Sequence, residues 1–239
     1  MIVDTIHTYN RDLYNSLWAI ERVDSVLNST NTFPIFLEEA GLLFRAYRIS
    51  TKFGVCLLHK HYSLTDDQYP IEFAENLVEG DALVTKAVSQ ISRKLEANRW
   101  KLTKAGLIPL EFSEAECLPP STSSEMQCMP DAFFCDLHLL LRNYGFQDLI
   151  GFCVAERRFY AGKPSDAIAI EATDLAAKAN IVTITNESLL EGRYVETCWQ
   201  FPWKETEAAV VTCPRVCNAY CYIIFDHKPG HYNIHSGHH

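Results

Sequence analysis

The feature that most constrains the fold is an approximate internal repeat at a spacing of about 97 residues. The segment RAYRISTKFGVCLLHKHY, which starts at Arg45, aligns without a gap with the later RNYGFQDLIGFCVAERRF. Four of the eighteen positions are identical, and among them Gly54 meets Gly151 and Cys56 meets Cys153. We therefore expect two similar units, each a little under a hundred residues long.

An amphipathic stretch precedes each aligned segment, and a proline opens it. The first stretch runs from Pro34 to Tyr47 and the second from Pro130 to Tyr144. Proline suits the first turn of a helix because its missing N–H would have no partner there. We predict one helix at the start of each unit.

Strand-like segments with polar turns between them follow each helix. They are 53–62, 70–76, 82–88 and 107–112 in the first unit, and 167–173, 180–186 and 193–201 in the second. Such short connections favour antiparallel neighbours, since a parallel crossover needs a dozen or more residues. The predicted class is α+β, with two pseudo-symmetric repeats that each pack a helix on a mainly antiparallel sheet.

These units divide the chain into five parts. The predicted parts are an N-terminal helix (1–30), the first repeat (31–115), a Pro/Ser-rich linker (116–127), the second repeat (128–203) and a Cys/His-rich C-terminal segment (204–239). Within the first part, apolar residues recur at helical spacing from residue 10 to about residue 27.

Charge and hydropathy exclude two classes of partner. The formal net charge is −9, whereas a nucleic-acid binder needs a basic face. The densest run of basic residues also contains Glu96, and such a mixture of charges predicts a solvated helix face. The basic residues of this run are Arg93, Lys94, Arg99, Lys101 and Lys104. No apolar stretch is long enough to cross a bilayer. We expect no nucleic-acid and no membrane partner, while a small-molecule ligand and a homo-oligomer stay open.

Cysteine usage bears on the compartment. Nine cysteines is an odd count, and Cys56, Cys135 and Cys153 stand in apolar runs, where a free thiol behaves as a small hydrophobe. The N-terminal stretch carries Asp4 and no apolar signal-peptide region. The sequence therefore predicts a cytoplasmic protein with reduced core thiols.

The predicted strand from Phe53 to Tyr62 ends in His59-Lys60-His61. Because side chains alternate across a strand, His59 and His61 share one face, with their β-carbons roughly 7 Å apart. Two neutral imidazoles at that separation could share a divalent metal such as zinc, or act as a general acid/base pair. The alternative is that both are buried strand-end residues hydrogen-bonded to neighbours.

The matching positions of the second unit are Glu156 and Arg158. A pseudo-two-fold axis could bring them to the histidines, with Glu156 as a third ligand or as the carboxylate that orients an imidazole. The candidate catalytic set is therefore His59, His61, Glu156 and Arg158.

A second candidate site lies near the C-terminus. Cys213, Cys217 and Cys221 are spaced by four, and His227 follows. On a helix these thiols would line one face, and together with the imidazole they could hold a structural zinc. The alternative is that the cysteines are core residues.

The stretch VCLLHKHY, within residues 53–62, resembles the LLHxHF-type segment of a set of uncharacterised fungal proteins. The resemblance implies a fungal source and a connection with small-molecule metabolism, and it brings no known activity, fold or cofactor.

Two functions follow as expectations. The first is an enzyme of small-molecule metabolism, metal-dependent if the histidines bind a cation, with its site around His59 and His61 between the repeats. The second is a non-catalytic binding or scaffold protein with structural histidines. The chain contains no GxSxG, HExxH, GxGxxG or Gly-rich phosphate loop. A deep pocket that reaches both imidazoles would favour the enzyme, and burial of both rings without any cavity would favour the second function.

Overall fold

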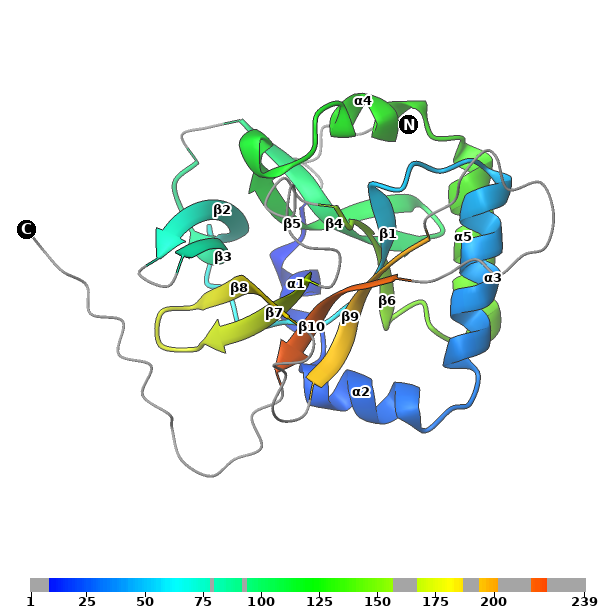
Figure 1. The fold of residues 1–239 in the computed structure, drawn as a ribbon, viewed down its shortest axis with the longest axis horizontal. Coiled ribbons are helices and arrows are strands. Elements are labelled where there is room, and N and C mark those ends of the chain that lie inside the picture. The colour runs from blue at the N-terminus through cyan, green and yellow to red at the C-terminus, as the bar shows by residue number, and fades with distance from the viewer. Residues whose placement is uncertain are drawn as a thin grey trace, which may run out of the picture.

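The strands of the computed structural model close into a barrel (Figure 1). The structure describes residues 9–77, 80–91, 94–156, 167–186, 194–201 and 216–222. Within them the strand order around the barrel is β1-β6-β4-β5-β2-β3-β8-β7-β10-β9, and β9 pairs with β1. The strands are β1 (Phe53–Leu57), β2 (Tyr69–Leu77), β3 (Gly80–Val88), β4 (Leu95–Thr103), β5 (Gly106–Glu114), β6 (Ile150–Val154), β7 (Ala167–Asp174), β8 (Ala179–Asn186), β9 (Tyr194–Gln200) and β10 (Val216–Tyr222).

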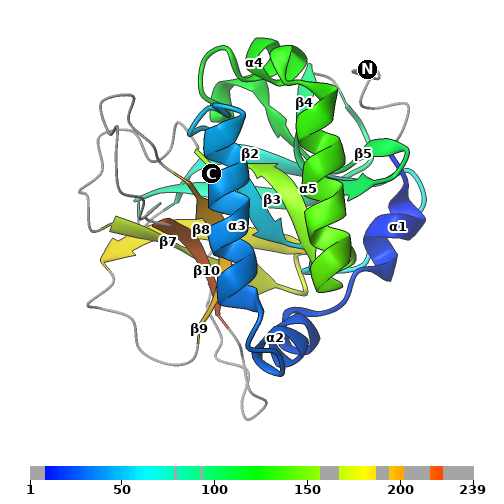
Figure 2. The ribbon, with the colours of Figure 1, turned by 90° about the vertical axis from the view of Figure 1, so that its right-hand side faces the viewer.

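Helices cover one side of this barrel. The helices α3 and α5 run next to each other across it (Figure 2). As predicted, Pro34 stands in the first turn of α3, and α5 begins directly after Pro130. The helices are α1 (Arg11–Ser16), α2 (Ile20–Asn28), α3 (Phe33–Ala46), α4 (Thr122–Cys128) and α5 (Asp131–Tyr144), with a 3-10 turn at Ala115–Cys117. None of these described helices has the length and apolar character needed to cross a lipid bilayer. The chain is thus a mixed α and β protein, as the sequence predicted.

Side chains on β1 and β6 alternate between the two faces of the sheet, so they contribute to two different apolar regions. Phe152 packs outward against Phe44 of α3 and Phe133 of α5, with ring centroids 6.2 and 6.0 Å apart. On the opposite face, Cys56 and Cys153 join a buried cluster that also draws residues from β3, β7, β8 and β9, so this cluster lies on the inner side of the barrel. Its members are Cys56, Leu83, Cys117, Cys153, Ala155, Ala169, Val182 and Cys198.

The cysteine prediction holds in part. Within the described residues, seven cysteines form no disulfide bond. Cys56 and Cys153 are buried as expected, whereas Cys135 is exposed on α5. An apolar neighbourhood in the sequence did not place Cys135 in the core because only one stripe of a helix faces inward.

Two glycines allow the strands of the barrel to approach closely. A β-carbon on Gly54 would lie 2.1 Å from the carbonyl oxygen of Trp199, and one on Gly151 would lie 2.5 Å from that of Trp100. Real β-carbons do not come that close to a carbonyl oxygen, so each position requires glycine.

Several predicted elements are wrong in type or extent. The N-terminal helix is two helices, because Leu17 adopts an extended conformation after α1. Of the basic run, Arg99 and Lys101 lie in β4 and not on a helix, and a bulge in this strand shifts the apolar alternation by one residue and hides the strand period. The zinc hypothesis for the cysteine segment considered a helix, but residues 216–222 form β10. The histidine strand ends at Leu57, so His59 and His61 follow it.

Candidate metal centre

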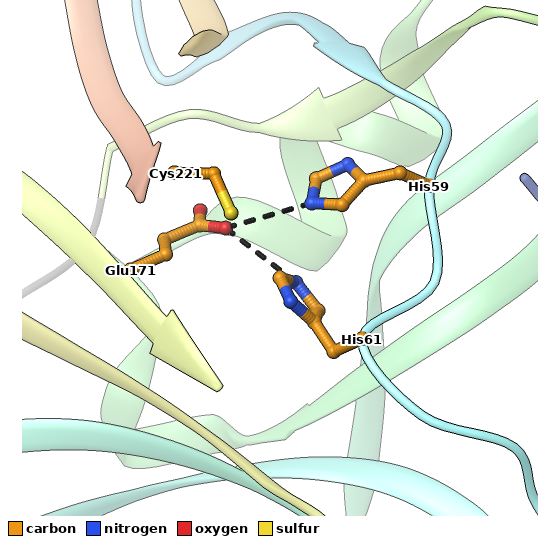
Figure 3. A group of neighbouring side chains, drawn as sticks. All are labelled: His59, His61, Glu171 and Cys221. Atoms are coloured by element: carbon orange, nitrogen blue, oxygen red, sulfur yellow. Dashed lines mark ion pairs between the residues drawn. The ribbon is translucent and has the colours of Figure 1, made fainter. Parts of the chain in front are cut away.

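Two histidines, a glutamate and a cysteine meet inside the protein (Figure 3). His59 and His61 follow β1, Glu171 belongs to β7, and Cys221 belongs to β10. The strands β7 and β10 are parallel neighbours, with Cys221 opposite Glu171. One ligand atom from each of the four residues lies within 4.8 Å of all the others. The side chains of both histidines and of Glu171 are at most 3% exposed, and Cys221 is buried.

Three of these atoms face one another without a hydrogen bond. Oε2 of Glu171 lies 3.5 Å from Nε2 of His61 and 3.9 Å from Nε2 of His59. All three atoms are buried, and none of them has a hydrogen-bond partner among the described residues. Leaving a buried polar atom unpaired costs about 1–3 kcal/mol, so three at one point form a costly arrangement unless a cation or a shared proton joins them.

The other nitrogen of each imidazole has a partner. Nδ1 of His59 lies 3.2 Å from the carbonyl oxygen of Leu57. Because a carbonyl only accepts, Nδ1 carries the proton and donates it, and Nε2 presents a lone pair. Nδ1 of His61 lies 2.9 Å from the hydroxyl of Thr173. Metal-binding histidines are commonly held in this way through their second nitrogen.

Both imidazoles are neutral at ordinary pH. Burial lowers the pKa of His59 to about 4, although the nearby Glu171 opposes the shift. Burial, together with His59 and Arg99, holds the pKa of His61 well below its usual value. Neutral rings keep the lone pairs that a metal needs. Neither ring is a ready proton donor near pH 7.

Glu171 is held from its other side. Its Oε1 accepts a hydrogen bond of 3.2 Å from Nη2 of Arg99, and the hydroxyl of Thr197 lies 3.5 Å away. Nε of the same Arg99 lies 3.4 Å from Oε2 of Glu111. Burial alone would lower the pKa of Arg99, but Glu111 and Glu171 raise it well above its usual value. Arg99 is therefore a charged group inside the protein.

Cys221 supplies the fourth donor. Burial, and after it the negative charge of Glu171, raises the pKa of its thiol above the usual value. The residue is therefore a thiol in the metal-free protein. A bound divalent cation would favour the thiolate, which is the form that binds metal.

The structure brings together only some of the predicted site residues. His59, His61 and Cys221 meet, although the sequence assigned Cys221 to a different candidate site. Glu156 is not in the group: it is exposed and lies just after β6. Its backbone N–H donates to the carbonyl oxygen of Lys52. Cys217 lies in β10 opposite Trp199, and its side chain is outside the described part. Arg158, Cys213 and His227 also lie outside the described residues.

Sequence reasoning missed Glu171 and Arg99 as site residues. Glu171 interrupts the apolar strand segment AIAIEAT, and a carboxylate inside such a segment is a signal that could have been used. No comparable signal marks Arg99, which stands among other basic residues.

The set of donors fits a borderline-soft divalent metal. Two imidazoles, a carboxylate and a thiolate are all zinc ligands, and four donors complete a tetrahedral site. Oxygen-preferring ions such as Mg²⁺ and Ca²⁺ do not favour a site with sulfur and two nitrogens.

In comparisons with known proteins, the chain matches no family model, no curated protein and no solved structure.

Proposed function

We propose that this protein binds one divalent transition-metal ion, zinc by preference, through His59, His61, Glu171 and Cys221. The observation that carries the proposal is the convergence of three buried atoms without hydrogen bonds, Nε2 of both histidines and Oε2 of Glu171. A cation at that point would give each of them a partner, and Cys221 would complete the coordination.

The proposed role of the metal is structural. Four protein donors leave no open coordination position, and closed sites of this kind contribute to folding. Such an ion would tie the segment after β1 to β7 and β10, which come much later in the chain. The burial of both rings agrees with this non-catalytic reading. A cytoplasmic location, as expected from the sequence, would keep the thiol of Cys221 reduced.

A metal-dependent enzyme of small-molecule metabolism is the second candidate. Two histidines and a glutamate form a ligand set of catalytic zinc sites, in which water takes the fourth position. That arrangement would apply if Cys221 stayed a thiol and did not bind the ion. The raised pKa of Cys221 is the observation in its favour.

Elemental analysis of the full chain, purified without an affinity tag, tests the proposal. We expect one equivalent of metal in the wild type and none in the double variant His59→Ala/His61→Ala. His138→Ala on α5 is the matched control, because it also removes an imidazole and should keep the metal. A wild type without metal, or a double variant that retains it, would refute the proposal.

Cys221→Ser separates the structural from the catalytic reading. A four-ligand site should lose about 10-fold or more in zinc affinity. A three-ligand site should keep its affinity. Hydrolytic activity of the zinc-loaded protein on small esters or phosphoesters is then the measurement for the enzyme.

We also propose that the barrel consists of two fused copies of one unit. Exchanging β1 with β6, β2 with β7, β3 with β8, β4 with β9 and β5 with β10 leaves the strand order around the barrel unchanged. The pairing of β1 with β6 supports the same axis, because Val55 faces Phe152 while Gly54 faces Cys153 and Cys56 faces Gly151. In this proposal the second copy includes β10 and extends beyond residue 203.

A crystal structure tests the duplication through superposition of residues 33–114 on residues 131–222. Gly54 should fall on Gly151 and Cys56 on Cys153. If these pairs fell on different elements, the duplication would be wrong.

A further inference from the structure

We infer that Arg99 is the positioning residue of this centre, and that it restricts Glu171 to one metal-facing oxygen and thereby favours zinc over larger oxygen-preferring ions. The inference rests on the proposed metal site and adds a determinant of its selectivity.

The two carboxylate oxygens of Glu171 have different neighbours, and only one of them contacts Arg99. Oε1 accepts from Nη2 of Arg99 at 3.2 Å, while Oε2 faces the two histidines. A carboxylate fixed in this way binds a cation through a single oxygen. One oxygen, two nitrogens and one sulfur make a four-coordinate site, whereas Mn²⁺ and Ca²⁺ prefer more oxygen donors.

Arg99 itself is fixed by a second carboxylate. The residue pairs with Glu111 across β4 and β5, and its Nε lies 3.4 Å from Oε2 of Glu111. The exposed fractions are 14% for the side chain of Arg99, 7% for Glu111 and 2% for Glu171. The contact with Glu111 therefore holds the guanidinium at one place beside Glu171.

Only arginine can make both contacts at once. Its planar guanidinium presents donors along two edges, so Nε contacts Glu111 while Nη2 contacts Glu171. The ammonium group of lysine is a single point charge on a flexible stem. Arg99→Lys would therefore keep the charge and lose the fixed orientation of Glu171.

The test compares metal affinity in three variants of the full chain. Glu111→Gln is the matched control, because the amide oxygen of glutamine can still accept from Nε of Arg99 and the contact with Glu171 stays in place. Arg99→Gln/Glu111→Gln removes the guanidinium and the buried charge of Glu111 together. Arg99→Lys keeps the charge. Each is titrated with Zn²⁺, Mn²⁺ and Co²⁺ in competition with a chromophoric chelator.

We expect Glu111→Gln to stay within about 3-fold of the wild-type zinc affinity. The double variant should lose about 10- to 100-fold, as removal of a group that orients a ligand typically does. Its preference for Zn²⁺ over Mn²⁺ should narrow, and its Co²⁺ absorption should weaken as coordination rises above four. Arg99→Lys should show the same spectral change in smaller measure.

The outcomes separate this inference from the proposal on which it rests. If the wild type binds no metal, the proposed function fails. If the wild type binds zinc, and the double variant keeps both the zinc affinity and the Co²⁺ spectrum of Glu111→Gln, Arg99 has no positioning role. If the double variant does not fold by circular dichroism, Arg99→Lys decides, and an unchanged Co²⁺ spectrum there overturns the inference.

Discussion

Oε2 of Glu171 lies 3.5 Å from Nε2 of His61, and neither atom has a hydrogen bond within the described residues. His61 follows the first strand, and Glu171 lies in the seventh. The contact therefore joins the two halves of the chain at a point where two buried polar atoms face each other without a bond. Oε2 only accepts, and Nε2 also only accepts when the hydroxyl of Thr173 donates to Nδ1. In that tautomer a cation between the two atoms would give both of them a partner.

Metal removal should destabilise the protein. A ligand at 100 times its Kd stabilises the folded state by about 2.7 kcal/mol, which for a chain of this size shifts Tm by about 5–10 °C. We expect calorimetry to show that shift between zinc-loaded and chelator-treated wild type. The double variant His59→Ala/His61→Ala should show no difference between the two conditions, and a wild type that also showed none would speak against the site.

Acid should destabilise the metal-free protein through His59. Its pKa is about 4 in the folded state and about 6.5 when unfolded. Between these values the unfolded chain binds a proton that the folded chain does not bind. The contribution of His59 is therefore complete above pH 6.5 and falls as the pH drops toward 4, by on the order of 3 kcal/mol. Urea unfolding of metal-free protein at pH 7 and pH 4.5 measures the loss.

The control for this pH effect is His59→Asn. The variant lacks the titrating group, so the difference in unfolding free energy between the two pH values should shrink. It should not vanish, because burial shifts the pKa of His61 in the same direction. An identical pH dependence in wild type and variant would contradict the buried, neutral state of His59.

Adding one methyl group to the barrel at Gly54 should be strongly destabilising. Gly54→Ala places a carbon 2.1 Å from the carbonyl oxygen of Trp199, so β1 and β9 must separate. We expect a loss of about 2–4 kcal/mol in urea unfolding, since overpacking and lost strand pairing add. Gly145→Ala is the control, because nothing lies within 4 Å there and only its positive φ of 73° is strained. Equal losses in both variants would argue against the close approach.

The N-terminal helices hold the segment that carries the histidines. Nδ2 of Asn15 donates to the carbonyl oxygen of Leu64, and Oδ1 of Asn15 accepts from the backbone N–H of Leu64. The backbone N–H of Lys60 donates to the carbonyl of Trp18. Asn15→Ala should therefore loosen residues 58–64 without removing a ligand.

The expected result for Asn15→Ala is faster transfer of zinc to a chelator, by about 3- to 10-fold if the change weakens the segment by about 1 kcal/mol. The metal content at equilibrium should stay at one equivalent. Asn28→Ala is the control, because the side-chain hydrogen bond from Asn28 to Asp24 stays within one helix. Equal release rates in the two variants would show that the N-terminal contacts do not retain the metal.

The sequence by itself determined the local elements and one part of the site. Proline at the first turn marked α3 and α5, and period-two alternation marked most of the strands, because both signals depend only on backbone geometry and on burial of one face. His59 and His61 were predicted to share a site from the sequence alone, because residues two positions apart stay close together in space.

The tertiary structure decided the other donors and the closure of the barrel. Glu171 and Cys221 reach the histidines only because β7 and β10 pair in parallel, and no local pattern encodes pairing between strands that are distant in the chain. Arg99 was assigned to a solvated helix face because the bulge in β4 masks the strand period. Its buried position depends on Glu111 and Glu171 together, and only the closed barrel places both carboxylates beside one guanidinium.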